Sequence, residues 1–576
     1  MILRKARILL LLFNLFCVEV FPQAPDSFKM EWVIMNTTNL SHYDLSSYLC
    51  TEVQIKGVKD GDVLHELITK LPQIQTLTTH AKPGVIQNLI SPPETETETS
   101  ITVLWNKPIE YKTVNGYDVY LNGACVGYSK ITNYTIKDLK PNKNYSISIV
   151  AKDAEGKKSN RSKPVTVKTK PHGKVFNILA YGAKPDSGIV NTHAIQKAID
   201  ACAFGGIVVI PSGIFISGAL FLKSNMTLYI ARGGVLKGSL NTEDYSPMIK
   251  TRFEGWDFPA YASLITAGRL DETGQYNVKN ISIRGEGTIS GGGALLSKTM
   301  AENNANGIRG RGRLICLMNC EKVNIQGLAI EESPCWKIHY TYSKNVTCNG
   351  LKINSIKSKT PNGDGIDPDS SINSYIFNCS FATYDDCIAI KSGKNPQGNK
   401  VAKPCENIYI SNCNFIQGHS LAIGSEISGG IKNAQVIDCE LGNLWFGLQV
   451  KTTPKRGGYV EDLLVKDCNL QLINVVTSLP YNNDGESAPT LTKLKNFEFT
   501  NLNMTNGKTD QPVIYLEGFN DTANYAKNIT FKDIKLPTNS KVLVKHARDV
   551  IFENVKTSDG QNPVYDVFES VNVKHL

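Results

Sequence analysis

Residues 407–415 read NIYISNCNF, and the same pattern returns at residues 433–441 as NAQVIDCEL. Each segment starts with Asn, alternates apolar with polar residues, and reaches a second Asn or Asp before another apolar residue. Intervals between successive segments run from 21 residues (528 to 549) to 42 residues (280 to 322). A repeat of about thirty residues that carries short strands is typical of a solenoid. The pattern therefore predicts an all-β fold, a right-handed parallel β-helix, and it starts at Asn280, Lys322, Asn345, Asn373, Asn407, Asn433, Asp462, Asn496, Asn528 and Asp549.

The repeat region extends over residues 172–576 in this interpretation. Just before the repeat, residues 192–203 (THAIQKAIDACA) have apolar residues at helical spacing, and we expect this helix to cap the open end of the solenoid. Asn280 and Asn528 belong to Asn-x-Ser/Thr sequences, but they open repeats, where we expect stacked, inward-facing and hydrogen-bonded side chains. They are therefore discounted as glycosylation sites.

The chain has 14 cysteines, which in an exported protein would first suggest disulfides. Four of them, however, take the same place in successive repeats: Cys379, Cys413, Cys439 and Cys468. A recurring small residue at one position indicates a buried stack of thiols, and we expect most cysteines to be core residues.

Residues 82–171 have a different character, with short alternating strands and frequent turn signals, such as SITVLWNKP and GYDVYLNG. This pattern predicts a small β-sandwich. The LKPNKNY stretch, with Leu139, Pro141 and Tyr145, resembles the tyrosine corner of fibronectin type III domains. Such a domain is either a spacer that positions its neighbour or a module for glycan binding or docking, and the fold alone does not distinguish these roles.

Residues 1–24 resemble a secretory signal, because Arg4, Lys5 and Arg7 precede an apolar run that is too short to cross a bilayer. We expect cleavage near Ala24 and a secreted or periplasmic protein, with lipidation of Cys17 as the alternative. No other segment is apolar for long enough to span a membrane, and residues 25–81 remain unassigned.

The formal charge of +9 favours an anionic partner. A nucleic acid is not expected, because the chain has no basic helix, zinc-ligand spacing or aromatic RNA-binding platform. An acidic polysaccharide fits the same charge, so the choice depends on the motifs.

Four segments align through their inward apolar pairs: GIDPD from residue 365, CIAIK from 387, SLAIG from 420 and GLQVK from 447. Neighbouring strands of a parallel sheet lie about 4.8 Å apart, so residues in one column are within side-chain reach. Strict alternation would turn Asp386 inward, so we expect a turn or bulge before Cys387. The columns are Asp364, Asp386, His419 and Phe446; then Asp367, Ala389, Ala422 and Gln449; then Asp369, Lys391, Gly424 and Lys451.

Carboxylates, a histidine and lysines on one face suit hydrolysis of a glycosidic bond in an anionic polymer. One carboxylic acid protonates the leaving oxygen while another carboxylate activates water, and carboxylates spaced for an inserted water predict inversion. Metal-dependent elimination is the competing chemistry, but it needs clustered Ca²⁺ ligands, whereas Lys391 and Lys451 are close to these carboxylates. We therefore expect no metal and no cofactor.

From about residue 175 onward the chain resembles glycoside hydrolase family 28, the polygalacturonases. The matching motifs are NGDGIDPDS from Asn362, YDDCIAIKSG from Tyr384, GHSLAIGSE from Gly418, and GLQVKT from Gly447. The resemblance implies that Asp386 is the general acid, that Asp364 and Asp385 hold the nucleophilic water, and that His419 positions the acid. It also implies that Lys451, together with Lys391, Asn362 and the residue at position 449, binds the substrate.

Two positions depart from the family motifs. Gly363 replaces the Thr of Asn-Thr-Asp, and Gln449 replaces the Arg of Arg-x-Lys. An amide cannot provide the bidentate clamp of a guanidinium, so substrate identity is open at this point. Arg309, Arg311 and Arg313 are candidate replacements, with a solvated basic loop as the alternative.

Three functional hypotheses remain. The first is a hydrolase of α-1,4-galacturonan in pectin. The second is a hydrolase of another acidic pectin backbone, such as rhamnogalacturonan or a decorated galacturonan, and the third is a β-helix that binds polysaccharide without catalysis. Long insertions after residues 241 and 290 predict a cleft closed at one end and exo action, and the sandwich domain and GSEISGG resemble bacterial exo-acting members. The oligomeric state is left open.

Overall fold

The computed structural model describes residues 6–12, 14–24, 27–34, 50–56, 82–186, 188–478 and 483–576. The chain forms two compact units, Met1–Ala81 and Lys82–Leu576. In the first unit the backbone forms an antiparallel sheet in the order β1 (Ala6–Leu12), β2 (Asn14–Ala24), β3 (Ser27–Ile34) and β4 (Cys50–Lys56). The predicted signal segment includes β1 and β2, and its cleavage stays a prediction. Among the described residues, no helix combines the length and the apolar character needed to cross a bilayer.

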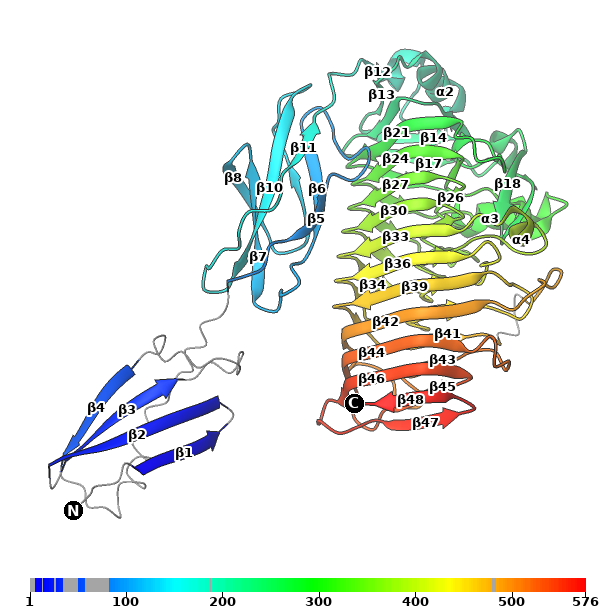
Figure 1. Ribbon diagram of the computed structural model, residues 1–576. Coiled ribbons are helices and arrows are strands. Elements are labelled where there is room, and N and C mark those ends of the chain that lie inside the picture. Colours follow the sequence, from blue (N-terminus) through cyan, green and yellow to red (C-terminus); the bar gives the residue numbers. More distant parts are fainter. Residues whose placement is uncertain are drawn as a thin grey trace. The chain divides into compact units, whose positions relative to one another are not determined.

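The second unit begins with a β-sandwich of two antiparallel sheets (Figure 1). Trp105 and Tyr117 are buried between the sheets and meet edge to face, with ring centroids 5.3 Å apart. The Tyr145 hydroxyl accepts a hydrogen bond of 2.8 Å from the Lys140 amide, which is the bond of a tyrosine corner. The strands are β5 (Gln87–Ile90), β6 (Ile101–Asn106), β7 (Val114–Leu121), β8 (Ala124–Ser129), β9 (Asn133–Ile136), β10 (Asn144–Asp153) and β11 (Val165–Lys168).

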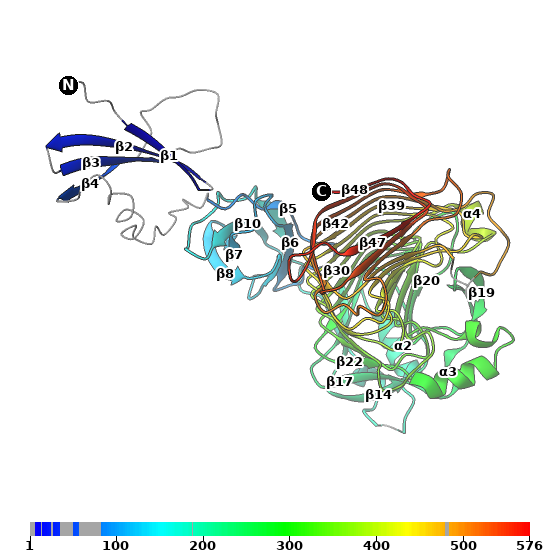
Figure 2. The ribbon, with the colours of Figure 1, turned by 90° about the horizontal axis from the view of Figure 1, so that it is seen from below.

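The remainder is a parallel β-helix, as the repeat predicts. A 12-stranded parallel sheet forms one wall, and a 23-stranded sheet forms the rest of each rung (Figures 1 and 2). The 12-stranded sheet, called the site sheet below, consists of β15 (Leu220–Leu222), β20 (Ile265–Gly268), β23 (Ile315–Met318), β26 (Ile338–Thr341), β29 (Ile366–Asp369), β32 (Ile388–Ile390), β35 (Leu421–Ile423), β38 (Leu448–Lys451), β41 (Ile473–Val476), β43 (Ile514–Glu517), β45 (Lys541–Lys545) and β47 (Val564–Phe568).

The 23-stranded sheet folds around the other sides of the solenoid. Its strands are β12 (Val175–Asn177), β13 (Gly206–Ile210), β14 (Gly213–Ser217), β16 (Met226–Ile230), β17 (Gly234–Gly238), β21 (Val278–Gly285), β22 (Thr288–Ser290), β24 (Cys320–Gln326), β25 (Ala329–Glu331), β27 (Lys344–Asn349), β28 (Lys352–Asn354), β30 (Ile372–Phe377), β31 (Ser380–Ala382), β33 (Cys405–Ser411), β34 (Asn414–Gln417), β36 (Ile431–Ile437), β37 (Glu440–Leu441), β39 (Tyr459–Lys466), β40 (Asn469–Leu470), β42 (Lys493–Asn503), β44 (Ala526–Leu536), β46 (Ala547–Thr557) and β48 (Val571–His575).

The helix expected before the repeat is α2 (Thr192–Ala201), and it lies at the N-terminal end of the solenoid (Figure 1). Ile195, Ala198 and Ile199 are buried and belong to the same core as the rungs. The helix therefore covers apolar surface that the first rung would otherwise expose.

Equivalent residues stack along the interior. The four cysteines Cys379, Cys413, Cys439 and Cys468 are at most 3% exposed and unpaired, as predicted. The rings of Phe499 and Phe531 stack at 4.9 Å, and those of Phe531 and Phe552 at 4.8 Å. Identical residues on successive rungs thus bury one another.

The Asn residues that open the repeats are hydrogen-bonded, but the expected inward direction is wrong. They lie within strands, such as β21 and β44, at positions with positive φ, where Asn is tolerated better than branched residues. Asn528 is exposed, and its Nδ2 donates to Asn496 Oδ1 at 3.2 Å. Asn280 donates in the same way to Asn225 Oδ1 at 2.7 Å. These side chains form a hydrogen-bonded ladder that runs from rung to rung along the 23-stranded sheet.

The two long insertions fold into compact elements beside the site sheet, and Figures 1 and 2 show them on its outer side. The first contains the hairpin β18 (Ile249–Phe253) and β19 (Trp256–Ala260). The second contains α3 (Gly293–Glu302) and the 3-10 helix η4 (Gly307–Gly310). The short helix α4 (Gln397–Val401) follows β32, and two further 3-10 turns are η2 (Ile178–Tyr181) and η3 (Thr242–Tyr245).

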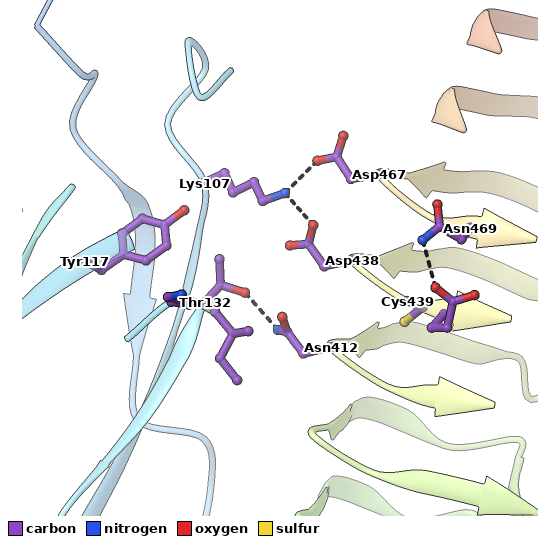
Figure 3. Close-up of a pocket in the computed structure, with 11 residues that line it drawn as sticks. Lys107, Tyr117, Thr132, Asn412, Asp438, Cys439, Asp467 and Asn469 are labelled. Carbon is purple, nitrogen blue, oxygen red and sulfur yellow. Dashed lines mark hydrogen bonds and ion pairs between the residues drawn. The ribbon is translucent and has the colours of Figure 1, made fainter. Parts of the chain in front are cut away.

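The sandwich contacts the solenoid at turns within the 23-stranded sheet (Figure 3). Lys107 forms ion pairs with Asp438 and Asp467, the latter at 3.0 Å. The Tyr111 hydroxyl also donates to Asp467, and Asn412 Nδ2 donates to Thr132 Oγ1 at 2.9 Å. These turns do not belong to the site sheet.

Candidate active site

The predicted register of the four motif strands is confirmed by the backbone pairing. Ile366 pairs with Ile388, Ile388 with Leu421, and Leu421 with Leu448. Asp369 and Lys391 also form a parallel bridge. Strands β29, β32, β35 and β38 are therefore consecutive in the site sheet, and the residues before each strand lie along one line.

Asp385 and Asp386 lie in a turn immediately before β32, which begins at Ile388. Strict alternation of inward and outward side chains therefore does not apply to Asp386. The expected turn before Cys387 allows its side chain to face outward, toward the cavity. The Asp386 amide donates to Asp385 Oδ1 at 2.9 Å, and Thr383 Oγ1 donates to the Asp385 carbonyl at 2.7 Å. These bonds hold both carboxylates at the start of the strand.

Asp386 has a partner on each carboxylate oxygen. Ser420 Oγ donates to Oδ1, and Lys451 Nζ lies 2.8 Å from Oδ2. Both partners come from the two following rungs, so the register of the solenoid determines the orientation of this carboxylate. Asp386 is only 4% exposed.

Asp385 pairs with His419, whose Nδ1 lies 3.1 Å from Asp385 Oδ1. Burial alone would raise the pKa of Asp385, but the hydrogen bond and charge of His419, with Lys451, lower it below its ordinary value. The same hydrogen bond raises the pKa of His419. The environment of Asp385 therefore favours its ionised form.

Asp364 has the opposite character. Burial, together with the negative charges of Asp385 and Asp367, raises its pKa well above the usual value. Its Oδ1 has no hydrogen-bond partner among the described residues, and Lys391 Nζ lies 3.8 Å from its Oδ2. Two neighbouring carboxyl groups with opposite protonation preferences are typical of acid–base sites.

Lys391 lies beneath the cavity within a cluster of carboxylates. Its Nζ is 3.5 Å from Asp367 and 3.7 Å from Glu426, and it lies 4.6 Å from the centre of the Trp336 ring. The side chain lines the cavity, but its charge is compensated by protein groups. Lys391 therefore holds carboxylates in place as well as facing the cavity.

The other two candidate substrate-binding residues differ in position. Asn362 lines the cavity, and its Oδ1 accepts a bond of 2.7 Å from Arg311 Nη2. Gln449 is 2% exposed and does not line the cavity. The solvated-loop alternative is wrong for Arg311 and Arg313, because each is 1% exposed. Arg311 does not line the cavity itself, but its hydrogen bond holds the Asn362 side chain that does.

These residues surround a cavity of about 430 Å³. Sequence reasoning missed four of its lining residues, Glu254, Trp336, Ser425 and Glu426. Glu426 follows the His419 motif directly in GSE, which was the available signal, whereas Glu254 reaches the site from a distant insertion. The cavity is lined by Glu254, Trp336, Asn362, Asp364, Asp385, Asp386, Lys391, His419, Gly424, Ser425, Glu426, Phe446 and Lys451.

A wall of ion pairs stands at the opposite ends of the strands from the carboxylates. Arg309 contacts Glu254 at 3.1 Å and Asp484 at 3.5 Å. Lys394 and Arg456 also contact Asp484, at 3.2 and 2.9 Å. The β18–β19 hairpin, η4 and the segments after β32, β38 and β41 are thereby joined, and we refer to this cluster as the end wall.

A cation would meet three ligand groups here, since oxygen and nitrogen atoms of Asp385, Asp386 and His419 lie within 4.8 Å of one another. Both Asp386 oxygens already contact Ser420 and Lys451, however. A metal ion would have to displace the Lys451 ammonium, so the donor set fits a lysine-compensated carboxylate pair better.

Comparison with known proteins agrees with this geometry. Residues 249–560 match the model of glycosyl hydrolases family 28, and residues 86–168 match that of the fibronectin type III domain. An exo-poly-alpha-D-galacturonosidase of Dickeya chrysanthemi is 27% identical over 548 residues, covering 82% of this chain and 90% of that protein. A probable polygalacturonase of Vitis vinifera is 31% identical over 310 residues, covering 51% of this chain and 60% of its own length.

A family 28 exopolygalacturonase from Yersinia enterocolitica superposes with a TM-score of 0.77 at 26% identity, covering 85% of this chain and 99% of that chain. An exopolygalacturonase from Thermotoga maritima gives a TM-score of 0.52 at 26% identity, covering 70% and 92%. The β-helix, the column of carboxylates and the family match lead to one conclusion: the chain belongs to family 28 of the glycosyl hydrolases and carries a fibronectin type III domain.

Proposed function

We propose that this glycoside hydrolase cleaves α-1,4-galacturonosidic bonds of polygalacturonate, acts from a chain end, and inverts the anomeric carbon. The observation that carries the proposal is the cavity in which Asp385, Asp386 and Lys451 meet beside the end wall. The names of the Dickeya and Yersinia relatives support the same substrate and mode of action.

In this mechanism Asp386 protonates the glycosidic oxygen while the bond to the anomeric carbon breaks. A water molecule held by Asp385 and Asp364 attacks that carbon, and Asp385 takes the water proton because it is the ionised carboxylate. Solvent then removes the proton from Asp385 and returns one to Asp386. His419 keeps Asp385 in position through the 3.1 Å contact.

Lys451 explains how an ion-paired carboxylate can act as an acid. In the unliganded site its Nζ lies 2.8 Å from Asp386. A substrate carboxylate competes for this ammonium and leaves Asp386 Oδ2 free to reach the glycosidic oxygen. A galacturonate unit would thus promote its own cleavage, whereas a neutral sugar would leave Asp386 paired.

The first test compares wild type with Asp386→Asn on polygalacturonate, with and without chelator. An amide cannot donate the proton, so turnover should fall by about 10² to 10⁴ while the variant still binds the polymer. Reducing ends released equally in chelator support hydrolysis without a metal. Activity within a few-fold of wild type would remove Asp386 from the acid role, and activity on another acidic pectin instead would favour the second hypothesis.

Product analysis tests the finer statements. Exo action predicts mono- or digalacturonate from the first minutes and a slow fall in viscosity, and inversion predicts initial release of the β-anomer in an NMR time course. Mixed chain lengths with a rapid fall in viscosity would show an open cleft. Export is proposed from the basic and apolar start of the chain, and N-terminal sequencing of the protein from culture fractions tests it.

A further inference from the structure

A second cavity of about 340 Å³ lies next to the reaction cavity. Four apolar side chains form one part of its lining: Ile416, Leu444, Trp445 and Leu472. Side-chain amides and one lysine form the other part. The amides are Gln417, Asn443, Gln471 and Gln511, and the single cation is Lys508. We call this cavity the Trp445 groove.

The adjacent residues Trp445 and Phe446 connect the two cavities, because Phe446 lines the first and Trp445 the second. The Trp445 ring stacks on His419 with centroids 4.7 Å apart and an angle of 27° between the planes. Backbone bonds from Trp445 to Gly418 O at 3.1 Å and from Phe446 to His419 O at 2.8 Å hold this turn in place. The groove therefore lies beside His419.

Trp445 is 63% exposed, although its ring is held by His419. An exposed ring that lines a cavity and is held by a neighbouring ring is a preformed surface for a ligand. A flat ring provides a surface for the C–H face of a sugar, while neighbouring amides can donate to and accept from hydroxyl groups. This combination is suited to a carbohydrate.

The charge of the groove selects an acidic carbohydrate. Lys508 lines it, and none of its lining residues is acidic. The cavity at the junction with the sandwich makes a useful contrast, because its three acids outnumber its two lysines, Lys107 and Lys130, and Lys107 is already paired with two of those acids. Of these two cavities, only the Trp445 groove has both an aromatic platform and a net positive lining.

We propose that the Trp445 groove binds further uronate residues of the chain whose terminal part occupies the reaction cavity. This inference rests on the proposed function, because exo action would place the chain terminus at the end wall, so that the rest of the polymer extends away from it. The end wall lies beyond the ends of the strands, whereas Trp445 precedes β38 on the carboxylate side. The groove thus offers the continuing polymer a path away from the wall.

The experiment measures binding of di- to hexagalacturonate by calorimetry to the Asp386→Asn protein. Affinity should rise with chain length until the groove is filled. Lys508→Ala in the same background should weaken the longer chains by about three- to tenfold, the effect of one exposed charge contact, and weaken digalacturonate less. Lys527→Ala, which removes an exposed lysine far along the sequence on β44, is the matched control.

Trp445→Phe should retain most of the chain-length dependence, and Trp445→Ala should lose it. If the Lys508→Ala and Lys527→Ala proteins bind every chain length with equal affinity, the Trp445 groove does not bind uronates. This holds even if the wild-type enzyme cleaves polygalacturonate. Failure of the Asp386→Asn protein to bind any galacturonate, with no wild-type activity, would instead overturn the proposed substrate. A competing neutral oligosaccharide bound as tightly as the uronates would remove the role of Lys508.

Discussion

At the residue scale, the site shifts the pKa values of two nearby carboxyl groups, Asp385 and Asp364, in opposite directions. Asp385 is ionised because His419 lies 3.1 Å away, and Asp364 resists ionisation because it is buried beside other negative charges. Such an arrangement opposes stability, since Asp364 is buried while its Oδ1 has no partner in the part of the chain that the structure describes. The cost is a sign of function, because a purely structural residue here would be neutral or fully paired.

Asp364→Asn should therefore raise stability while it lowers activity. The pKa of Asp364 is raised in the folded state, so the folded protein holds a proton that the unfolded chain releases above its ordinary pKa of 3.8. The contribution of Asp364 to the free energy of unfolding is therefore fully present below pH 3.8 and is lost as the pH rises toward the pKa of the folded state. The variant should gain about 1–2 kcal/mol at neutral pH, measured as a higher Tm, and the gain should shrink on acidification.

Asp510→Asn provides the control for this change, because Asp510 is exposed and far along the sequence from the site motifs. It should leave Tm within about 1 °C of wild type. If Asp364→Asn melts lower than Asp510→Asn at neutral pH, the carboxylate stabilises the fold and the interpretation of its burial fails.

At the scale of elements, the β18–β19 hairpin is attached to the site sheet by Arg252. This residue is 1% exposed, and its guanidinium contacts Asp257 at 2.8 Å within the hairpin and Asp369 at 3.2 Å on β29. Burial would raise the pKa of Asp369, but Arg252 and His339 lower it to about 2. Glu254, at the tip of the same hairpin, lines the reaction cavity, so this attachment also positions the end wall.

Arg252→Met should destabilise the protein by about 3–5 kcal/mol, because it leaves Asp369 buried without its main cation. The lowered pKa of Asp369 stabilises the fold above its ordinary pKa of 3.8, and this stability is lost as pH falls toward 2. The difference between wild type and variant in denaturant melts should therefore be constant near neutral pH and shrink below about pH 4.

Arg232→Met removes a comparable but exposed contact with Glu286, with the arginine side chain 86% exposed, and it should cost at most about 1 kcal/mol. If the two variants lose equal stability, the buried attachment has no special role. We also expect Arg252→Met to release a wider range of product lengths, since a loosened hairpin opens the end wall.

At the scale of the molecule, the sandwich is attached to the solenoid where two acids are stacked. Asp438 and Asp467 occupy equivalent turns with positive φ on neighbouring rungs. Like charges at this spacing repel, and Lys107 from the sandwich contacts both. The contact is remote from the site sheet, which favours the spacer role of the sandwich over direct contact with substrate.

Lys107→Met should lower the stability of the chain by about 1–3 kcal/mol and separate the unfolding of the sandwich from that of the solenoid in calorimetry. Adding Asp438→Asn to this variant should restore part of the loss, because one of the two repelling charges is then absent. Lys158→Met, which removes a lysine that pairs with Asp118 within the sandwich, is the control. A double variant no more stable than Lys107→Met would contradict this account.

The sequence alone was sufficient for the fold and for the column of catalytic candidates. A repeat forces each rung to stack on the last, so the pairing of Ile366, Ile388, Leu421 and Leu448 follows from aligning inward apolar residues. The same alignment places Asp386 in one column with Asp364 and His419, whereas its contact with Lys451 appears only in the structure. Local periodicity contains this information because neighbouring rungs contact one another in a regular order.

Only the tertiary structure decided which charges are compensated and which surfaces are left for a ligand. Gln449 is buried, Arg311 supports Asn362, and Glu254 reaches the cavity through an insertion whose fold no repeat specifies. The pairs Arg252–Asp369 and Lys107–Asp467 join residues more than a hundred positions apart. Such contacts depend on the path of irregular segments in space, which has no period in the sequence, and the end wall and the Trp445 groove arise from those segments.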